Sequence, residues 1–475
     1  MSLTKLTAIF AFILLNISNL QSQKLWTLAE CIEYAEHNNI QLRIQELGIK
    51  MQEESVLQSQ MSFLPNLSAN ASGSYNWGKT IDRFTNQFAD TRVSSVNLYL
   101  QSSMTLFNGF YLLNNVKKQN LELLAQRQEM EAALNMKSLE ITTAFLQILY
   151  GKENLSVVRQ QVSLSEMQVT RTQQLIDAGV LAEGDLFNMK SQLASDISKK
   201  VQAENDLELA YLNLKQLMDL PADTLFDIEA PEINIADKTA ELLAASTVYN
   251  FAVQNQPEIR SAETRYELSL RNLALSRSRY YPTLTISGGV GTGFSGANKV
   301  IDGTPVFTGL FPNGDITASG DTVLTPAFDY NTMTKPFSDQ MDENLNYSAG
   351  LYLSIPIFNN YQTKSQINIS KLNVQQAELQ LDKAKQDLRK TIEQAYADAR
   401  AAFNSYQAAF LNVKALEESF NYSSKKYDAG LINSFDLNNA RILHENALNN
   451  LINAKYSYIF RIKVLDFYFG KPLTF

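Results

Sequence analysis

Two periodicities alternate along this chain. Residues 27–62 carry apolar side chains at helical spacing, and Pro65 ends that pattern. From Asn66 to Trp77 every even-numbered position is Asn or Ser, and the odd-numbered positions hold Leu, Ala, Gly, Tyr and Trp. This uninterrupted alternation over twelve residues predicts a strand with one polar and one apolar face. Its length matches the roughly 9–11 residues that a membrane-spanning strand needs.

A long helical hairpin follows the first pair of strands. A second alternating strand is predicted up to residue 107, and a proline-free helix then runs from Tyr111 to Ile176. At 1.5 Å per residue such a helix would be about 100 Å long. After a turn, the return helix is predicted over 185–218.

The same order of segments then repeats. The second copy comprises a helix over 248–281 interrupted by Pro257, strands over 283–290 and 344–357, a long helix over 361–427 and a return helix over 436–467. Between these strands, residues 291–343 are rich in Gly, Asp, Thr and Pro and predict a long exposed loop. The turns Asp177-Ala178-Gly179 and Asp428-Ala429-Gly430 lie 251 positions apart, so we predict a duplicated unit with two helical-hairpin tips.

The second long helix carries a strict seven-residue repeat. Its members are Ile367, Val374, Leu381, Leu388, Ala395, Ala402 and Ala409. A heptad repeat sustained this far predicts a left-handed coiled coil, because a straight helix would drift out of register.

These patterns predict the organisation of the chain. Lys5 followed by an apolar run and a polar stretch is typical of a secretory signal peptide, which we place at 1–22. The remaining boundaries are a first repeat at 23–220 with its β-hairpin at 66–107 and tip at 177–185, a connector at 221–243, and a second repeat at 244–475 with its β-hairpin at 283–358 and tip at 428–436.

Composition and motifs argue against catalysis and nucleic-acid binding. The net charge is −8, whereas nucleic acid requires clustered Lys and Arg. One cysteine excludes an intramolecular disulfide, and two histidines offer little for metal binding. The formal G-x-G-x-x-G at 291–296 precedes a Gly- and Pro-rich stretch, whereas a dinucleotide site requires a helix there. We predict no enzyme, no catalytic residue, no cofactor and no metal site.

The strands predict an assembly of several chains. No segment after the signal peptide has 18 consecutive apolar residues, so membrane insertion is expected only as a barrel. Four strands cannot close a barrel, since the smallest membrane barrels have about eight. Tyr75, Trp77, Tyr280 and Tyr281 lie where an aromatic girdle is expected. The alternative is that these are short core strands of a soluble protein.

The chain resembles the TolC-like outer membrane efflux proteins, the outer membrane factors. The resemblance rests on the paired tips with Asp-x-Gly and Asp-Leu, the prolines at 65 and 282, and the Leu-Phe-Asn and Ile-Phe-Asn strand ends. It implies an α+β membrane protein in which a duplicated unit supplies four transmembrane strands and long coiled-coil hairpins. It also implies a homotrimer with a twelve-stranded β-barrel in the outer membrane lipid and an α-helical tunnel in the periplasm.

The resemblance further implies a function and partners. Such a protein is the passive exit duct of a tripartite efflux or type I secretion system. It joins a periplasmic adaptor (membrane fusion) protein and an inner-membrane transporter, which supplies the energy. Two alternatives remain, a stand-alone porin and a coiled-coil structural protein of the cell surface. A porin would not need such long helices, and a structural protein would not need the alternating strands.

Two sets of residues are candidate functional sites. Asp185, Asn188, Asp436 and Asn439 are expected at the tunnel entrance, where three copies of each Asp form a carboxylate ring that favours cations. The family pattern has a second acidic residue one turn later, and Asn occupies that position here. The alternative is that both Asp residues are helix N-caps.

The tips themselves form the second set. By resemblance they dock against the adaptor through Asp177, Gly179, Val180, Leu181, Asp428, Gly430, Leu431 and Ile432. The alternative is that they are ordinary turns, in which each Gly permits the left-handed backbone that ends a helix.

Overall fold

The computed structural model describes residues 25–89, 92–231 and 243–473, so the predicted signal peptide at 1–22 lies outside the described residues. The chain divides into two compact units. Unit 1 comprises Met1–Glu54, Asn120–Ser269 and Asn373–Phe475, and unit 2 comprises Ser55–Gln119 and Leu270–Leu372.

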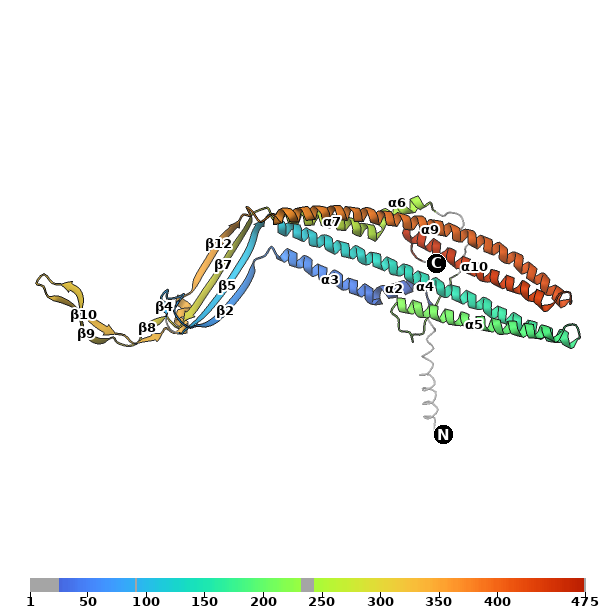
Figure 1. Ribbon diagram of the computed structural model, residues 1–475, viewed down its shortest axis with the longest axis horizontal. Helices are drawn as coiled ribbons and strands as arrows, with labels where there is room; N and C mark the ends of the chain where they lie inside the picture. The colour runs from blue at the N-terminus through green and yellow to red at the C-terminus, as the bar shows by residue number, and fades with distance from the viewer. Residues whose placement is uncertain (1–24, 90–91, 232–242, 474–475) are drawn as a thin grey trace, which may run out of the picture. The chain divides into compact units, whose positions relative to one another are not determined.

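Unit 1 contains most of two long helical hairpins, whose first helices begin in unit 2. One joins α4 (Tyr111–Asp177) to α5 (Glu183–Leu217), and the other joins α9 (Gln362–Asp428) to α10 (Ser434–Tyr468). The helices of each hairpin lie side by side, and the two turns meet at one end of the unit (Figure 1). The four helices were predicted to within two residues at every end, because nothing interrupts the helical periodicity before the turn residues.

The prediction of one helix over 27–62 is wrong. The structure has α2 (Leu28–Asn38) and α3 (Ile40–Met61), separated by Asn39 in an extended conformation. The Asn39 side chain accepts hydrogen bonds from the backbone N–H groups of Gln41 and Leu42, and so caps α3. Its amide also donates to the carbonyl of Leu217 at 3.2 Å. A partner 178 residues away stabilises the break, which is why the local periodicity did not reveal it.

The corresponding break in the second repeat was predicted. There α6 (Ala245–Asn255) ends before Pro257, which begins α7 (Pro257–Ser278). Proline lacks the backbone N–H that a helix interior requires, so this break is visible in the sequence.

The main core of unit 1 lies where α2, α4, α5 and α10 come together. Cys31, Ile141, Phe145 and Leu214 are fully buried there, and the short parallel pair β1 (Leu25–Trp26) and β6 (Asp227–Ile228) borders it. Burial raises the pKa of the Cys31 thiol to about 12, so the thiol stays protonated and behaves as a small apolar side chain.

The heptad stripe of α9 lies on the covered side of that helix. None of its seven members is exposed. Near the middle, Leu388 packs with Val248 and Ile259, and Ala395 packs with Leu465 of α10. The small alanines allow the two helix backbones to approach closely there.

Unit 2 is built on a four-stranded antiparallel sheet. Its strand order is β12 (Asn346–Ser354), β7 (Thr283–Ser295), β5 (Val93–Asn108) and β2 (Asn66–Asn76). All three pairings are antiparallel. β2 and β12 are the outer strands, and each has one neighbour among the described strands. Such an edge presents unpaired backbone groups that can pair with a strand of another chain.

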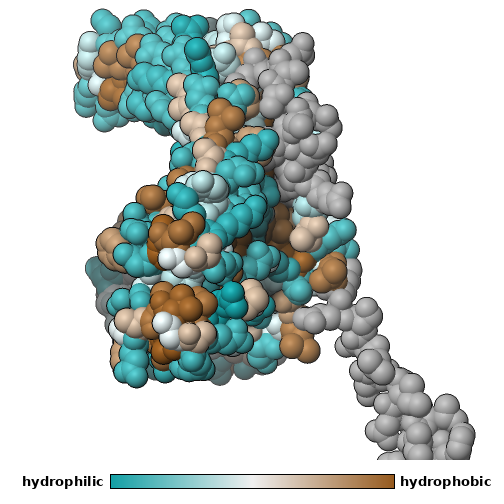
Figure 2. Space-filling model, turned by 90° about the vertical axis from the view of Figure 1, so that its right-hand side faces the viewer, coloured by the Kyte–Doolittle hydropathy of each residue, from teal (hydrophilic) through white to brown (hydrophobic). Residues whose placement is uncertain are grey.

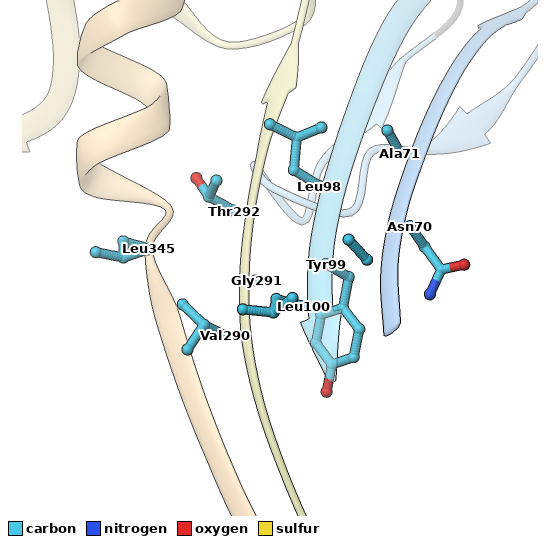
Figure 3. Close-up of a pocket in the computed structure, with 10 residues that line it drawn as sticks. Asn70, Ala71, Leu98, Tyr99, Leu100, Val290, Gly291, Thr292 and Leu345 are labelled. Carbon is cyan, nitrogen blue, oxygen red and sulfur yellow. The ribbon is translucent and has the colours of Figure 1, made fainter. Parts of the chain in front are cut away.

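The two faces of the sheet differ as the sequence predicted. The register places Leu98 of β5 beside Ala71 of β2 and Thr292 of β7, as Figure 3 shows. The apolar face continues through Leu67, Ala69, Leu100, Met104, Ile286, Val290, Leu351 and Leu353. The polar face carries Asn66, Ser68, Asn70, Asn97, Tyr99, Gln101, Asn346 and Ser348.

The prediction of a long exposed loop over 291–343 is wrong in that the segment forms strands and a helix, although most of its side chains are exposed as expected. The segment contains the end of β7 and then β8 (Lys299–Ile301), β9 (Val306–Ile316), β10 (Thr322–Asp329), β11 (Thr332–Thr334) and α8 (Phe337–Glu343). β9 pairs with β10, and β8 pairs with β11. Gly and Pro occur inside these strands and conceal the alternation, while the pairing supplies the backbone hydrogen bonds that hold them.

Among the helices of the described residues, none combines the length and the apolar composition needed to cross a lipid bilayer.

Candidate channel entrance at the hairpin tips

Both tips end their first helix with the same glycine turn. Gly179 has φ of 76° and Gly430 has φ of 70°. The N–H of Gly179 donates to the carbonyl of Ile176 and the N–H of Val180 to that of Leu175, each at 2.8 Å. Gly430 and its successor repeat this pattern in the second tip. The paired hydrogen bonds are those of a Schellman motif, which satisfies the last carbonyls of a helix.

We expect Gly179→Ala to destabilise the protein by about 1–2 kcal/mol, because a Cβ disfavours the left-handed backbone. An added Cβ would meet no atom within 4 Å, so the effect is one of backbone conformation and not of packing. Thermal unfolding of the purified protein followed by circular dichroism measures it. Gly184→Ala is the control, since Gly184 lies in α5 with equally open space. Equal destabilisation by both substitutions would contradict the argument.

The alternative that Asp185 and Asp436 are N-caps is wrong. The N-cap of α5 is Ala182, which has no capping side chain, and that of α10 is Asn433. The Asn433 side chain accepts a hydrogen bond of 2.9 Å from the backbone N–H of Asp436. Both Asp residues therefore occupy the same position, three residues inside the first turn. The positive end of the helix dipole favours a carboxylate there.

Contacts between the two tips join the hairpins at this end of unit 1. Ser434 donates a hydrogen bond to the carboxylate of Asp185. Thr172 and Tyr427 share a buried hydrogen bond of 2.9 Å. Burial, aided by nearby carboxylates including that of Asp185, raises the pKa of the Tyr427 phenol, so the shared hydroxyl pair is neutral at physiological pH.

A buried cluster of charges lies further along the helices, between the same two hairpins. Arg441 of α10 and Asp196 of α5 are almost fully buried, and their charged groups are 3.1 Å apart. Ser165 of α4 donates to Asp196 at 2.6 Å and accepts a hydrogen bond from Arg441. Lys199 lies 3.1 Å from Asp196, and Glu445 lies 3.4 Å from Arg441. Three helices are thus joined through one arginine.

The environment of the cluster shifts the pKa values of its two carboxyl groups in opposite directions. For Asp196, burial opposes ionisation, but the hydrogen bond from Ser165 and the charge of Arg441 outweigh it and lower the pKa. For Glu445, burial dominates and raises the pKa. Asp196 is therefore the principal anionic partner of Arg441.

Sequence reasoning missed this cluster, although a signal was present. Asp196 lies seven residues after Met189 and seven before Ala203, and both of these are buried on α5. Arg441 and Glu445 likewise follow the buried Leu437 at intervals of four. Charged residues on an otherwise covered stripe require partners from a facing helix, which the sequence alone does not identify.

The remaining predicted site residues lie on the surface of the tips. Asp177, Asp428, Asn188 and Asn439 are exposed, as are Val180 and Leu431, while Leu181 and Ile432 are half-buried. Figure 2 faces this end of the helices and shows hydrophobic side chains gathered on it. Val180 also lies 3.6 Å from the position of a Cβ at Gly430, so the two turns are in contact.

Comparison with known proteins identifies the family of this chain. Residues 31–219 and 248–470 match the outer membrane efflux protein family, and so cover most of both halves. The chain belongs to this family. Among its relatives, the outer membrane protein TolC of Vibrio cholerae is 22% identical over 93% of this chain and 90% of its own length. The efflux protein BepC of Brucella suis is 20% identical over 87% of this chain and 79% of its own length.

Solved structures of outer membrane efflux proteins share its fold. CusC matches with a TM-score of 0.75 at 15% identity, covering 96% of both chains. VceC of Vibrio cholerae matches with a TM-score of 0.70 at 17% identity, covering 94% of this chain and 96% of that one. The fold is thus that of trimeric channels with a β-barrel and a helical tunnel, and the prediction of fold class is confirmed.

Family membership also establishes the cellular location and the assembly of this outer membrane efflux protein. It is an outer membrane channel with a periplasmic helical portion, the exit duct of a tripartite system. It works as a homotrimer with a periplasmic adaptor and an inner-membrane transporter. The family consists of channel proteins and not of enzymes.

Proposed function

We propose that the two hairpin tips form both the gated entrance of the channel and the surface on which the adaptor docks. The observation that carries this proposal is the contact between the tips, in which Asp185 of one hairpin accepts a hydrogen bond from Ser434 of the other. The side chain of Asp185 therefore lines the entrance and also links the two hairpins.

The gate residues are Asp185, Asn188, Asp436 and Asn439. Asp185 is half-buried and Asp436 exposed, each in the first turn of a return helix. In the trimer each position contributes three carboxylates at one level, which attract cations into the entrance. The amides of Asn188 and Asn439 follow one turn later and add hydrogen-bonding capacity without charge.

The docking residues are those of the turns, Asp177, Gly179, Val180 and Leu181 in one tip and Asp428, Gly430, Leu431 and Ile432 in the other. The side chain of Val180 is 55% exposed and that of Leu431 is 73% exposed. Apolar side chains grouped at an exposed end are typical of a protein interaction site. The charged Asp177 and Asp428 beside them provide a polar rim.

Transport through this channel is passive, and the chain has no enzymatic activity of its own. The two repeats, 23–220 and 244–475, contribute equivalent hairpins to the tunnel, and residues 221–243 connect them. The apolar sheet face is directed to lipid and the polar face to the lumen, because water fills the lumen of such a barrel.

We expect loss of this chain to raise the susceptibility of its host to toxic compounds. Wild-type protein should restore resistance, whereas Val180→Asp/Leu431→Asp should not, because carboxylates would break the apolar contact with the adaptor. Growth inhibition and co-purification of the adaptor measure the two effects. Leu225→Asp is the matched control, since Leu225 is 85% exposed and lies outside the tips. Full restoration by the tip variant would disprove docking at the tips.

A further inference from the structure

The segment between β3 (Thr80–Ile81) and β4 (Phe88–Ala89) is tied to the end of β7 in unit 2. We call residues 82–87 the strap. Asp82 is 4% exposed and accepts hydrogen bonds from the backbone N–H groups of Phe84 at 3.1 Å and Thr85 at 2.8 Å. It also accepts a hydrogen bond from the hydroxyl of Ser295, the fully buried last residue of β7. One buried carboxylate therefore holds the strap in shape and attaches it to the sheet.

The strap lies on the polar face of the sheet. The Phe84 ring covers Gly293, so closely that a Cβ at Gly293 would collide with it. Gly293 pairs with Asn97, which belongs to the polar face. Gly293 thus provides the space into which the Phe84 ring of the strap packs.

A groove on this face brings the strap together with neutral polar side chains. Its lining includes Arg83 and Phe84 of the strap, Asn97 and Tyr99 of β5, and Asn346 and Ser348 of β12. The ring of Tyr99 lies beside Gly291 (Figure 3), where a Cβ would collide with it. The Tyr99 hydroxyl is 3.2 Å from that of Ser348. Arg83 is exposed and is the charged residue among those that line the groove.

The strap lies at the ends of β2 and β5 opposite to those that join α3 and α4. β2 follows α3 and leads into the strap, and β5 returns from the strap to α4. Given the proposed function, in which the polar face borders the lumen, the strap lies inside the exit of the channel. Three copies of it narrow that exit.

We infer that the strap is a constriction of the exit and that Arg83 makes this constriction anion-favouring, so that the exit selects solutes opposite in charge to those favoured at the tips. A ring of guanidinium groups attracts anions and repels cations in a narrow pore. Asp82 is the positioning residue, because it holds the strap, and Arg83 is the specificity-determining residue. Negatively charged solutes are the class that this exit favours.

Ion selectivity in a planar bilayer tests the role of Arg83. All variants are made in a protein that carries Asp185→Asn/Asp436→Asn, so that the carboxylates of the tips do not mask the contribution of the exit to ion selectivity. We expect Arg83→Gln to shift the zero-current potential in a salt gradient towards higher cation permeability. Arg92→Gln is the control, because the Arg92 guanidinium lies over the ring of Tyr75, on the apolar face of the sheet, at 5.3 Å from its centroid. An unchanged potential in Arg83→Gln would overturn the inference.

Single-channel conductance tests the constriction itself. Asp82→Ala should raise the conductance, because the strap loses its attachment, and Ser295→Ala, which removes one hydrogen bond, should raise it less. Heat-resistant trimers on gels show that each variant has assembled. Wild-type conductance in both variants would overturn the inference of a constriction at the exit, but it would not contradict the proposed gate at the tips. A wild-type protein that forms no channel would overturn the proposed function as well.

Discussion

Replacing Arg441 by alanine is expected to lower the free energy of unfolding by about 3–5 kcal/mol, because the buried carboxylates of Asp196 and Glu445 lose their buried counter-charge and retain only the half-exposed Lys199. Arg441 is the common partner of Asp196, Ser165 and Glu445, and all three are buried. The expected result is the largest single-residue loss of stability among the variants described here.

Thermal unfolding of the purified trimer, together with the rate of proteolysis, measures this effect. Arg461→Ala is the matched control, since Arg461 also lies on α10 and pairs with an aspartate, Asp398, at 2.8 Å. Its side chain is 40% exposed, so the expected loss is at most about 1 kcal/mol. The double variant Asp196→Ala/Arg441→Ala should recover part of the loss, because the buried aspartate that has lost its buried partner is then also absent. Equal losses for Arg441 and Arg461 would show that the cluster is not a structural link between the hairpins.

Removing both acidic side chains of the tips is expected to change the channel from a small, cation-selective conductance to a larger and less selective one. Asp185→Ala/Asp436→Ala eliminates the carboxylate rings and, with Asp185, the acceptor of the Ser434 hydroxyl. The rings set the sign of the preferred ion, and the hydrogen bond helps to hold the tips together.

Single-channel recording separates these two contributions. Asp185→Asn removes the charge and keeps an oxygen that accepts from Ser434. We therefore expect this variant to lose part of the cation selectivity, since the carboxylates of Asp436 remain, with little increase in conductance, whereas Ser434→Ala should increase conductance and retain selectivity. A large and steady wild-type conductance that none of these substitutions alters would indicate an open pore and contradict the proposed gate.

The elements that the sequence predicted correctly are those specified by local patterns. The alternation over 66–77 and the long helical runs after Tyr111 and Tyr361 predicted β2, α4 and α9 because side-chain period follows directly from backbone geometry. Gly179 and Gly430 predicted the turns, since few other residues adopt their backbone angles without strain. The alternating strands also predicted that one chain alone cannot close a barrel.

Only the tertiary structure decided the features that depend on distant partners. The break at Asn39 relies on Leu217, the charge cluster joins residues of α4, α5 and α10, and the strap is attached by Asp82 to Ser295. The first turns of α5 and α10 were open to an N-cap interpretation until Ala182 and Asn433 proved to hold those positions. Periodicity reports which face of an element is covered but not what covers it. A buried polar group is stable only beside a partner, and folding brings that partner from elsewhere in the chain.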